Sequence, residues 1–180
     1  GATHMLATFD AWYPGYIDYM PVFQNIPSWW TETQGGNCAT PRISTLADLP
    51  APYRDLRPTP LYLSPWTEGK WGLRDAVDYM VTASTATLGY AAKYREELLY
   101  NRYQSGRNVI RKYRSHAPYA YIVPQAQRDP VAPVELLRRL AFMGVRVSQA
   151  DREVTVAGAK YPKGSWVIPM DQEYAELVKE

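Results

Sequence analysis

The strongest constraint on the fold is a helical pattern that runs from Leu73 to Arg114. Apolar or small side chains recur there every three or four residues, at Leu73, Ala76, Val77, Met80, Ala83, Ser84, Thr87, Leu88, Ala91, Tyr94, Leu98 and Leu99. This spacing places one apolar stripe along a helix. A single helix of about forty residues would far exceed the usual length of about a dozen. We therefore expect the helix to bend at Ser105-Gly106, or to project as a rod between two units.

Composition changes after Pro118, where a second region of strands and helices begins. Its expected elements, in chain order, are a strand at 119–124, a helix at 130–143 capped by Gly144, strands at 145–147, 153–157 and 166–169, and a final helix that starts at Asp171 as its N-cap. Strand, helix and strand in this order form a βαβ unit, which predicts parallel, right-handed pairing. The predicted fold class is therefore α/β.

The region before the long helix is less regular. Residues 6–12 are expected to form a strand, and a second strand should run from Val22 to Glu32, although Pro27 interrupts it. The long Pro-rich connection that follows contains one expected helical turn at Thr45–Asp48. Gly1–Met5 resembles a tag remnant. The expected organisation is a tag at 1–5, one segment at 6–116 and the start of an α/β domain at 117–180.

Charge and cysteine content exclude several functional classes. The 180 residues carry 20 basic and 18 acidic side chains, a net charge of +2, which argues against a general nucleic-acid binder. No apolar run approaches the length of a membrane span. One cysteine, Cys38, excludes an internal disulfide framework. By contrast, 15 Tyr and 6 Trp are many for this length and are typical of binding clefts and interfaces.

Few residues could perform catalysis. Histidine occurs only at His4 and His116, so no histidine- or thiolate-rich zinc site can be built from this chain. No phosphate-binding glycine loop or nucleophile elbow is present, and Cys38 has no base near it in sequence. Glu32 remains, because a carboxylate at the end of an aromatic strand can be removed from water and used as a general base. Alternatively, Glu32 is a capping residue beside packing aromatics.

A resemblance to a known protein family bears on whether Glu32 is a general base or a capping residue. Tyr13, Gly15, the run Ile17-Asp18-Tyr19 and an aromatic stretch ending in Glu32 resemble the last catalytic segment of zinc carboxypeptidases of the M14 (carboxypeptidase A-like) family. The run Leu-Arg-Asp-Ala-Val-Asp-Tyr-Met-Val-Thr-Ala-Ser from Leu73 is similar to the final catalytic-domain helix of large bacterial members. The match covers roughly residues 8–104. In such members a domain similar to a glutamine amidotransferase follows, and residues 118–180 resemble its first units.

The resemblance implies a role for each matched residue. Glu32 would act as the general base that activates a zinc-bound water, and Tyr13 would close over the C-terminal end of a peptide substrate. Ile17 and Trp30 would lie near the side-chain pocket, and Asp18 would be structural. The zinc ligands and the carboxylate-binding arginine of the family lie upstream of this segment. We therefore expect a fragment that is inactive alone, with zinc and peptide bound only by the complete enzyme.

Two other interpretations stay open. The chain could be a non-catalytic module whose aromatic segment binds a peptide or a partner protein, or residues 118–180 could form a ligand-binding α/β domain, which no phosphate-binding loop supports. In the fragment interpretation, exposed strand edges and apolar faces predict self-association. A secreted or periplasmic location of the complete enzyme is compatible with the resemblance, and the sequence does not decide the compartment.

Overall fold

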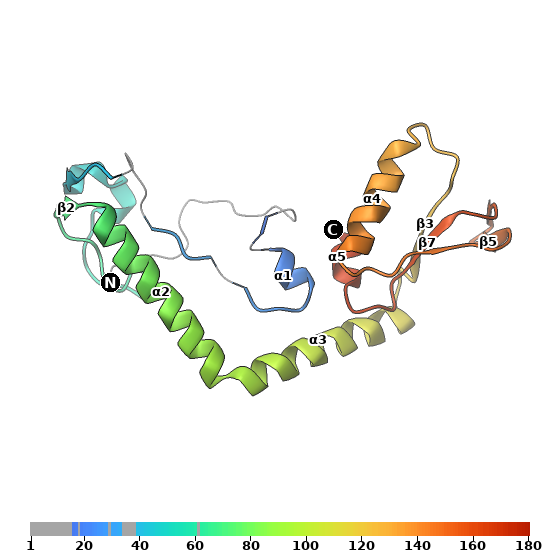
Figure 1. Ribbon diagram of the computed structural model, residues 1–180, viewed down its shortest axis with the longest axis horizontal. Helices are drawn as coiled ribbons and strands as arrows, with labels where there is room; N and C mark the ends of the chain where they lie inside the picture. Colours follow the sequence, from blue (N-terminus) through green and yellow to red (C-terminus); the bar gives the residue numbers. More distant parts are fainter. Residues whose placement is uncertain (1–15, 18, 29, 34–38, 61) are drawn as a thin grey trace. The chain divides into compact units, whose positions relative to one another are not determined.

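The computed structural model describes residues 16–17, 19–28, 30–33, 39–60 and 62–180, and its elements form a mixed α/β fold (Figure 1). The chain divides into two compact units. Of the described residues, unit 1 comprises 30–33, 39–60 and 62–94, and unit 2 comprises 16–17, 19–28 and Arg95–Glu180. The strand expected at residues 6–12 lies outside the described residues.

Unit 1 is built from short elements and one long helix. Its elements are β1 (Arg42–Ser44), the 3-10 turns η1 (Leu46–Asp48) and η2 (Ala51–Tyr53), β2 (Gly69–Trp71) and α2 (Leu73–Lys93). The strands β1 and β2 pair antiparallel, with Arg42 opposite Trp71. The helical turn expected at Thr45–Asp48 is confirmed by η1, which begins with a capping box between Thr45 and Asp48. This turn begins the connection between the two strands.

The long helical pattern forms two helices, so the expectation of one helix bent at Gly106 is wrong. Helix α2 ends at Lys93, and α3 runs from Arg95 to Ser115 without a break. Tyr94 between them has φ −110° and ψ 27°, outside the helical region. Glu96 and Glu97 then place negative charge in the first turn of α3, which favours a new helix start there.

Gly106 has a packing role in place of the expected hinge. It is buried in the middle of α3, where a Cβ atom would lie 3.3 Å from the Cβ of Glu173. Its small size therefore lets the loop before the last helix approach α3 closely. The low helix propensity of glycine does not break α3, because contacts with the rest of unit 2 stabilise the helix on this side.

The main sheet of unit 2 has the order β3 (Ala120–Val123), β7 (Trp166–Pro169) and β4 (Ser148–Gln149), with both pairings antiparallel. The strand expected at 119–124 and the helix expected at 130–143 are confirmed by β3 and by α4 (Val131–Phe142). The expected direct parallel pairing is wrong. Strands β3 and β4 do run in the same direction, but β7 lies between them, as in a split βαβ arrangement.

The segment at 145–147, which was expected to be a strand, does not form one. Val145 is 3 % exposed and packs in the core directly after α4, and the next strand begins only at Ser148. Gly144 ends α4 with φ +91°, as its expected cap role requires. The Gly144 amide donates to the Ala141 carbonyl, and the Val145 amide donates to the Leu140 carbonyl. These hydrogen bonds turn Val145 inward, so it fills the core instead of extending the sheet.

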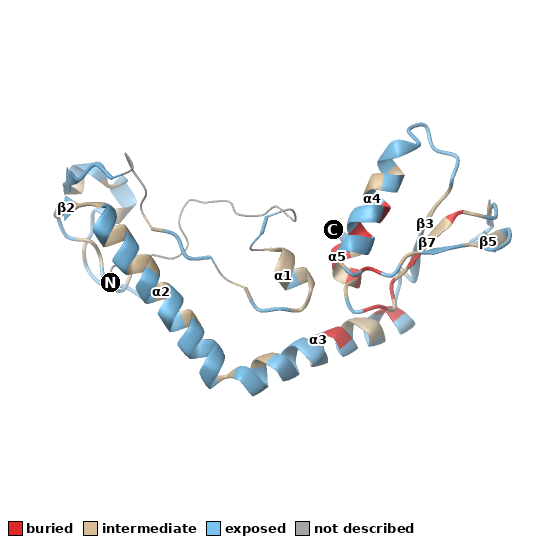
Figure 2. Cartoon of the chain, viewed as in Figure 1, coloured by how far each residue is buried: buried red, intermediate tan, exposed pale blue. Residues whose placement is uncertain are grey.

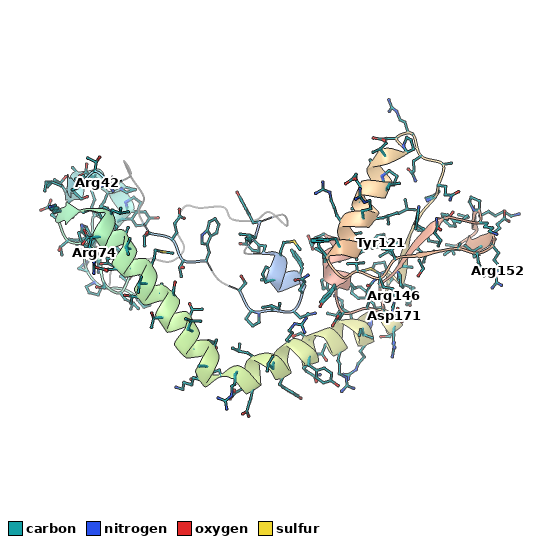
Figure 3. All side chains as sticks on the ribbon, viewed as in Figure 1. Arg42, Arg74, Tyr121, Arg146, Arg152 and Asp171 are labelled. Atoms are coloured by element: carbon teal, nitrogen blue, oxygen red, sulfur yellow. The ribbon has the colours of Figure 1, made fainter. Side chains whose placement is uncertain are left out.

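A hairpin and a short helix complete unit 2. The strands β5 (Val154–Val156) and β6 (Ala159–Tyr161) pair antiparallel, and only β5 had been expected. Positive φ at Ala157 (50°) and Gly158 (82°) forms the tight turn between them. The last helix, α5, spans Ala175–Lys179, so Asp171 is not its N-cap as expected. Instead, an Asp171 carboxylate oxygen accepts a hydrogen bond from the Arg146 guanidinium at 3.0 Å (Figure 3).

The strand expected between Val22 and Glu32 is also wrong. Residues Met20–Phe23 form a short helix, α1, with Pro21 in its first turn, where proline is favoured. The segment after α1 is anchored in unit 2 by two side-chain amides. Gln24 Nε2 donates to the Met143 carbonyl at 3.1 Å, and Asn25 Nδ2 donates to the Glu173 carbonyl at 2.9 Å. These tertiary contacts override the imperfect alternation of apolar residues.

Fully buried side chains among the described residues lie only in unit 2 (Figure 2). One core cluster contains Leu137, Leu140, Val145, Ile168 and Leu177, and the second contains Tyr113, Met170 and Ala175. In unit 1, apolar side chains of α2 are exposed, among them Val81 (58 %) and Leu88 (70 %). Unit 2 therefore carries a packed core, whereas α2 presents a large apolar surface.

Candidate functional site

A cavity of about 190 Å³ lies in unit 1, between the strand pair and the start of α2. The residues that line it are Glu32, Thr33, Ser44, Thr45, Leu46, Asp48, Leu49, Trp66, Glu68, Trp71 and Tyr79. Three carboxylates and three large aromatic side chains thus share one hollow. Binding sites commonly combine such apolar walls with a few polar groups.

Two of the carboxylates hold the wall of the cavity in place. Asp48 Oδ2 accepts hydrogen bonds from the Thr45 amide at 2.7 Å and from the Thr45 hydroxyl at 3.1 Å. The backbone hydrogen bond from Thr45 is the main reason that the pKa of Asp48 lies below its ordinary value. Glu68 Oε1 accepts a hydrogen bond from the Leu46 amide at 2.9 Å. Both carboxylates therefore stabilise η1 and its flanks.

The aromatic wall consists of Trp66, Trp71 and Tyr79. The rings of Trp66 and Trp71 meet edge to face, with centroids 5.1 Å apart, and Trp71 lies 5.6 Å from Tyr79. The indole Nε1 of Trp66 is buried and has no hydrogen-bond partner among the described residues. Buried donors are normally paired, so this N–H is available to an acceptor from a ligand.

The structure places the predicted site residues in different surroundings. Glu32 lies on the cavity wall with an exposed side chain, so its carboxylate is in contact with water in this structure. Trp30 is 46 % exposed and is not among the cavity residues. Ile17 is 88 % exposed and belongs to unit 2. Tyr13 and Asp18 lie outside the described residues.

Sequence reasoning missed the aromatic wall of this cavity. Trp66, Trp71 and Tyr79 lie far from the aromatic stretch on which the sequence argument concentrated. Trp71 belongs to β2 and Tyr79 to the second turn of α2, so the end of the strand and the start of the helix bring them together. The only signal in the sequence was the high density of aromatic residues between Tyr62 and Tyr79.

The described residues do not fit a zinc site. Within the ranges that the structure covers, no group of three or more His, Cys, Asp or Glu side chains is arranged to hold a metal ion. Asp48 and Glu68, which line the cavity, already accept backbone hydrogen bonds. His116 lies directly after α3, where its Nδ1 is 3.1 Å from the Lys112 carbonyl oxygen. No catalytic step can therefore be assigned to a metal held by these residues.

A functional assignment for this chain has to be argued from its sequence and from the geometry of its residues. No protein-family model, no curated protein and no solved structure matches the chain. The helices in the described ranges are all too short or too polar to cross a membrane.

Proposed function

We propose that the chain is a segment of a zinc carboxypeptidase of the M14 type, which removes C-terminal residues from peptides, with Glu32 as the general base. The observation that supports this proposal most directly is the order Tyr13, Gly15, Ile17-Asp18-Tyr19 and Glu32 within one aromatic stretch. The zinc ligands and the arginine that binds the substrate carboxylate would come from parts of the enzyme outside these 180 residues.

The surroundings of Glu32 are compatible with this role. Its side chain is exposed at the edge of an aromatic cavity, where it can reach both water and a bound ligand. A general base must lie within hydrogen-bond reach of the water whose proton it removes. The exposed apolar surface of α2 also supports the proposal, because further parts of a larger enzyme would cover Val81 and Leu88.

The test is the substitution Glu32→Gln in the longer enzyme that contains this segment. The amide keeps the shape of the side chain but cannot accept a proton, so turnover should fall by about 10²–10⁴-fold. Glu68→Gln is the matched control, because its amide oxygen can still accept the hydrogen bond from Leu46. Circular dichroism must show that both variants fold. Unchanged turnover of Glu32→Gln would contradict the role of Glu32 as general base.

The 180 residues alone provide a second test. We expect no hydrolysis of C-terminal residues by this chain, because its described residues provide no metal site. Peptide hydrolysis that is abolished by a chelator and restored by zinc would show that the chain contains a complete metal centre, and would overturn the proposal in its present form.

A second candidate function is that of a non-catalytic peptide-binding module. The observation that favours it is the buried, unpaired Trp66 Nε1 on the cavity wall, which could donate to a peptide carbonyl. Trp66→Phe removes this donor but keeps an aromatic ring. Peptide binding measured by calorimetry should then weaken by about tenfold, the cost of roughly one hydrogen bond. Tyr119→Phe, at an exposed residue of unit 2 outside the cavity lining, is the control.

A further inference from the structure

Helix α3 carries a row of side chains with the spacing of a coiled-coil seam. The positions alternate between steps of four and three residues, at Glu96, Tyr100, Tyr103, Arg107, Ile110 and Arg114. Such spacing keeps side chains on one face of a helix over many turns. The buried Gly106 and Tyr113, which pack within unit 2, lie about a quarter of a turn around the helix from this row. The helix therefore packs within its own unit on one side and presents this row on a neighbouring, more exposed side.

This second face, which we call the α3 seam, is accessible and partly apolar. Tyr100 and Tyr103 are 61 % and 59 % exposed. The Arg107 guanidinium lies 5.6 Å from the ring centroid of Tyr103, so these two side chains form one continuous surface. Beyond them, a hollow of about 230 Å³ is formed by Arg107, Ile110, Arg111 and Arg114. Exposed tyrosine beside arginine is typical of protein interfaces.

The two acidic residues of α3 lie at one end of the helix, where Arg95 pairs with Glu96 at 3.3 Å, and apart from Arg95 and Arg102 the basic residues lie in its second half. Glu96 and Glu97 occupy the first turn, and α3 contains no further acidic residue. Its second half carries Arg107, Arg111, Lys112 and Arg114. Of these, Lys112 pairs with Glu176, and Arg114 lies 3.8 Å from Asp171. The side chains of Glu97 and Arg111 form no ion pair with any described residue, so both charges are available to a partner.

We propose that two copies of this chain associate through antiparallel contact of their α3 seams. In this arrangement Tyr103 of each copy meets Arg107 of the other, and Tyr100 meets Ile110. At the ends, Glu96 meets Arg114, and Glu97 flanks Arg111. Each contact occurs twice, because the same surface of both copies meets across a two-fold axis. The tyrosines are covered, and both charged ends of the helix are neutralised.

Charge complementarity favours a second, antiparallel copy of α3 over a parallel copy or an anionic polymer. A parallel pair would place Arg107, Arg111 and Arg114 beside the same residues of the other copy, at a cost in like-charge repulsion. An anionic polymer would neutralise the basic half but would be repelled by Glu96 and Glu97. Only a surface with the reverse order of charges fits the whole seam, and a second α3 in antiparallel orientation has that order.

Charge reversal in the complete 180-residue chain tests the proposal. The variants are Glu97→Arg, Arg111→Glu and the double variant, with dimerisation measured by sedimentation equilibrium. Each single variant places like charges together at both symmetric positions, so the dissociation constant should rise by about tenfold or more. The double variant restores opposite charges and should return the constant to near that of the original chain. Arg152→Glu, on the turn before β5 (Figure 3), is the control that should leave dimerisation unchanged.

Three outcomes would overturn the proposal. They are a chain that stays monomeric at high concentration, an association that is insensitive to both single variants, and a double variant that is no better than the singles. Insensitive association would assign the contact to another surface, such as the apolar face of α2. Circular dichroism of each variant must first show unchanged helix content.

Cross-linking gives a second measurement that does not depend on charge. With Cys38 replaced by Ser, Gln104→Cys places a thiol beside the proposed two-fold axis, on the edge of the seam. A short bismaleimide should then join two copies rapidly. Ser105→Cys, one residue along and turned away from the seam, is the matched control and should cross-link slowly. Equal rates for the two variants would rule out the antiparallel register.

Discussion

The Lys112 ammonium lies 2.7 Å from Oε1 of Glu176, and this ion pair joins the last turn of α3 to α5. The second carboxylate oxygen of Glu176 accepts a hydrogen bond from the Tyr113 hydroxyl at 3.1 Å. Partial burial acts to raise the pKa of Glu176, but the hydrogen bonds from Lys112 and Tyr113 outweigh it, so this pKa lies below its ordinary value of 4.5. Both partners belong to unit 2.

We expect this carboxylate to make unit 2 sensitive to acid. Because the pKa of Glu176 is lower in the folded chain than in the unfolded one, its stabilisation is present above the unfolded pKa of about 4.5 and disappears as the pH falls through the lowered value. Glu176→Gln should therefore reduce the free energy of unfolding at pH 7 and lose less stability between pH 5 and pH 2. Urea denaturation at several pH values measures this. An unchanged acid dependence would contradict the prediction.

The buried amide of Gln172 should be essential for the stability of unit 2. Its side chain is 6 % exposed, and Oε1 accepts a hydrogen bond from the Arg146 amide at 2.6 Å. Its Nε2 donates to the carbonyls of Pro169 and Arg146. Gln172→Ala leaves these backbone groups without partners, and we expect a loss of about 1–3 kcal/mol in the free energy of unfolding.

The control for Gln172 is Gln149→Ala. The Gln149 side chain is exposed and makes one long hydrogen bond, at 3.3 Å, to the Gly164 carbonyl. Its removal should change the free energy of unfolding by less than about 0.5 kcal/mol. Similar losses for both variants in urea denaturation would show that the buried network has no special importance.

Gly144 should tolerate no side chain. Its φ of +91° is strained for other residues, and a Cβ atom would lie 3.0 Å from Cε2 of Tyr174. Gly144→Ala should therefore cost about 1–2 kcal/mol or more in stability, measured as a lower melting temperature. Gly158→Ala is the matched control, because its φ is also positive (82°) but no atom lies within 4 Å of the added Cβ. A larger loss for Gly158→Ala would contradict the steric argument.

The core of unit 2 should depend on β7. Ile168 in this strand is 2 % exposed and packs with Leu140 and Leu177. Ile168→Ala leaves a cavity in the core and should cost about 2–5 kcal/mol in the free energy of unfolding. Val156→Ala, on the outer hairpin with 47 % exposure, should cost less than about 1 kcal/mol. Equal losses would show that the two sites do not differ in packing.

Much of the fold could be predicted from local patterns in the sequence. Helical spacing predicted α4 and most of α2 and α3, and the apolar run before Pro124 predicted β3, because periodicity reports which side of an element is buried. The helical turn at Thr45–Asp48 was also predicted, and the capping box that begins it joins two residues that are close in sequence. The general-base assignment of Glu32 rests on sequence resemblance and stays a prediction.

Only the tertiary structure decided how these elements are paired. The position of β7 between β3 and β4 depends on contacts between residues far apart in the chain, which no local pattern encodes. Distant contacts also explain Gly106, because Glu173 approaches it closely and leaves little room for a side chain. They explain the position of α1 as well, since Gln24 and Asn25 bind the segment after it to the rest of unit 2. The cavity beside Glu32 likewise exists because the ends of β1, β2 and α2 meet, and this places Trp66, Trp71 and Tyr79 around it.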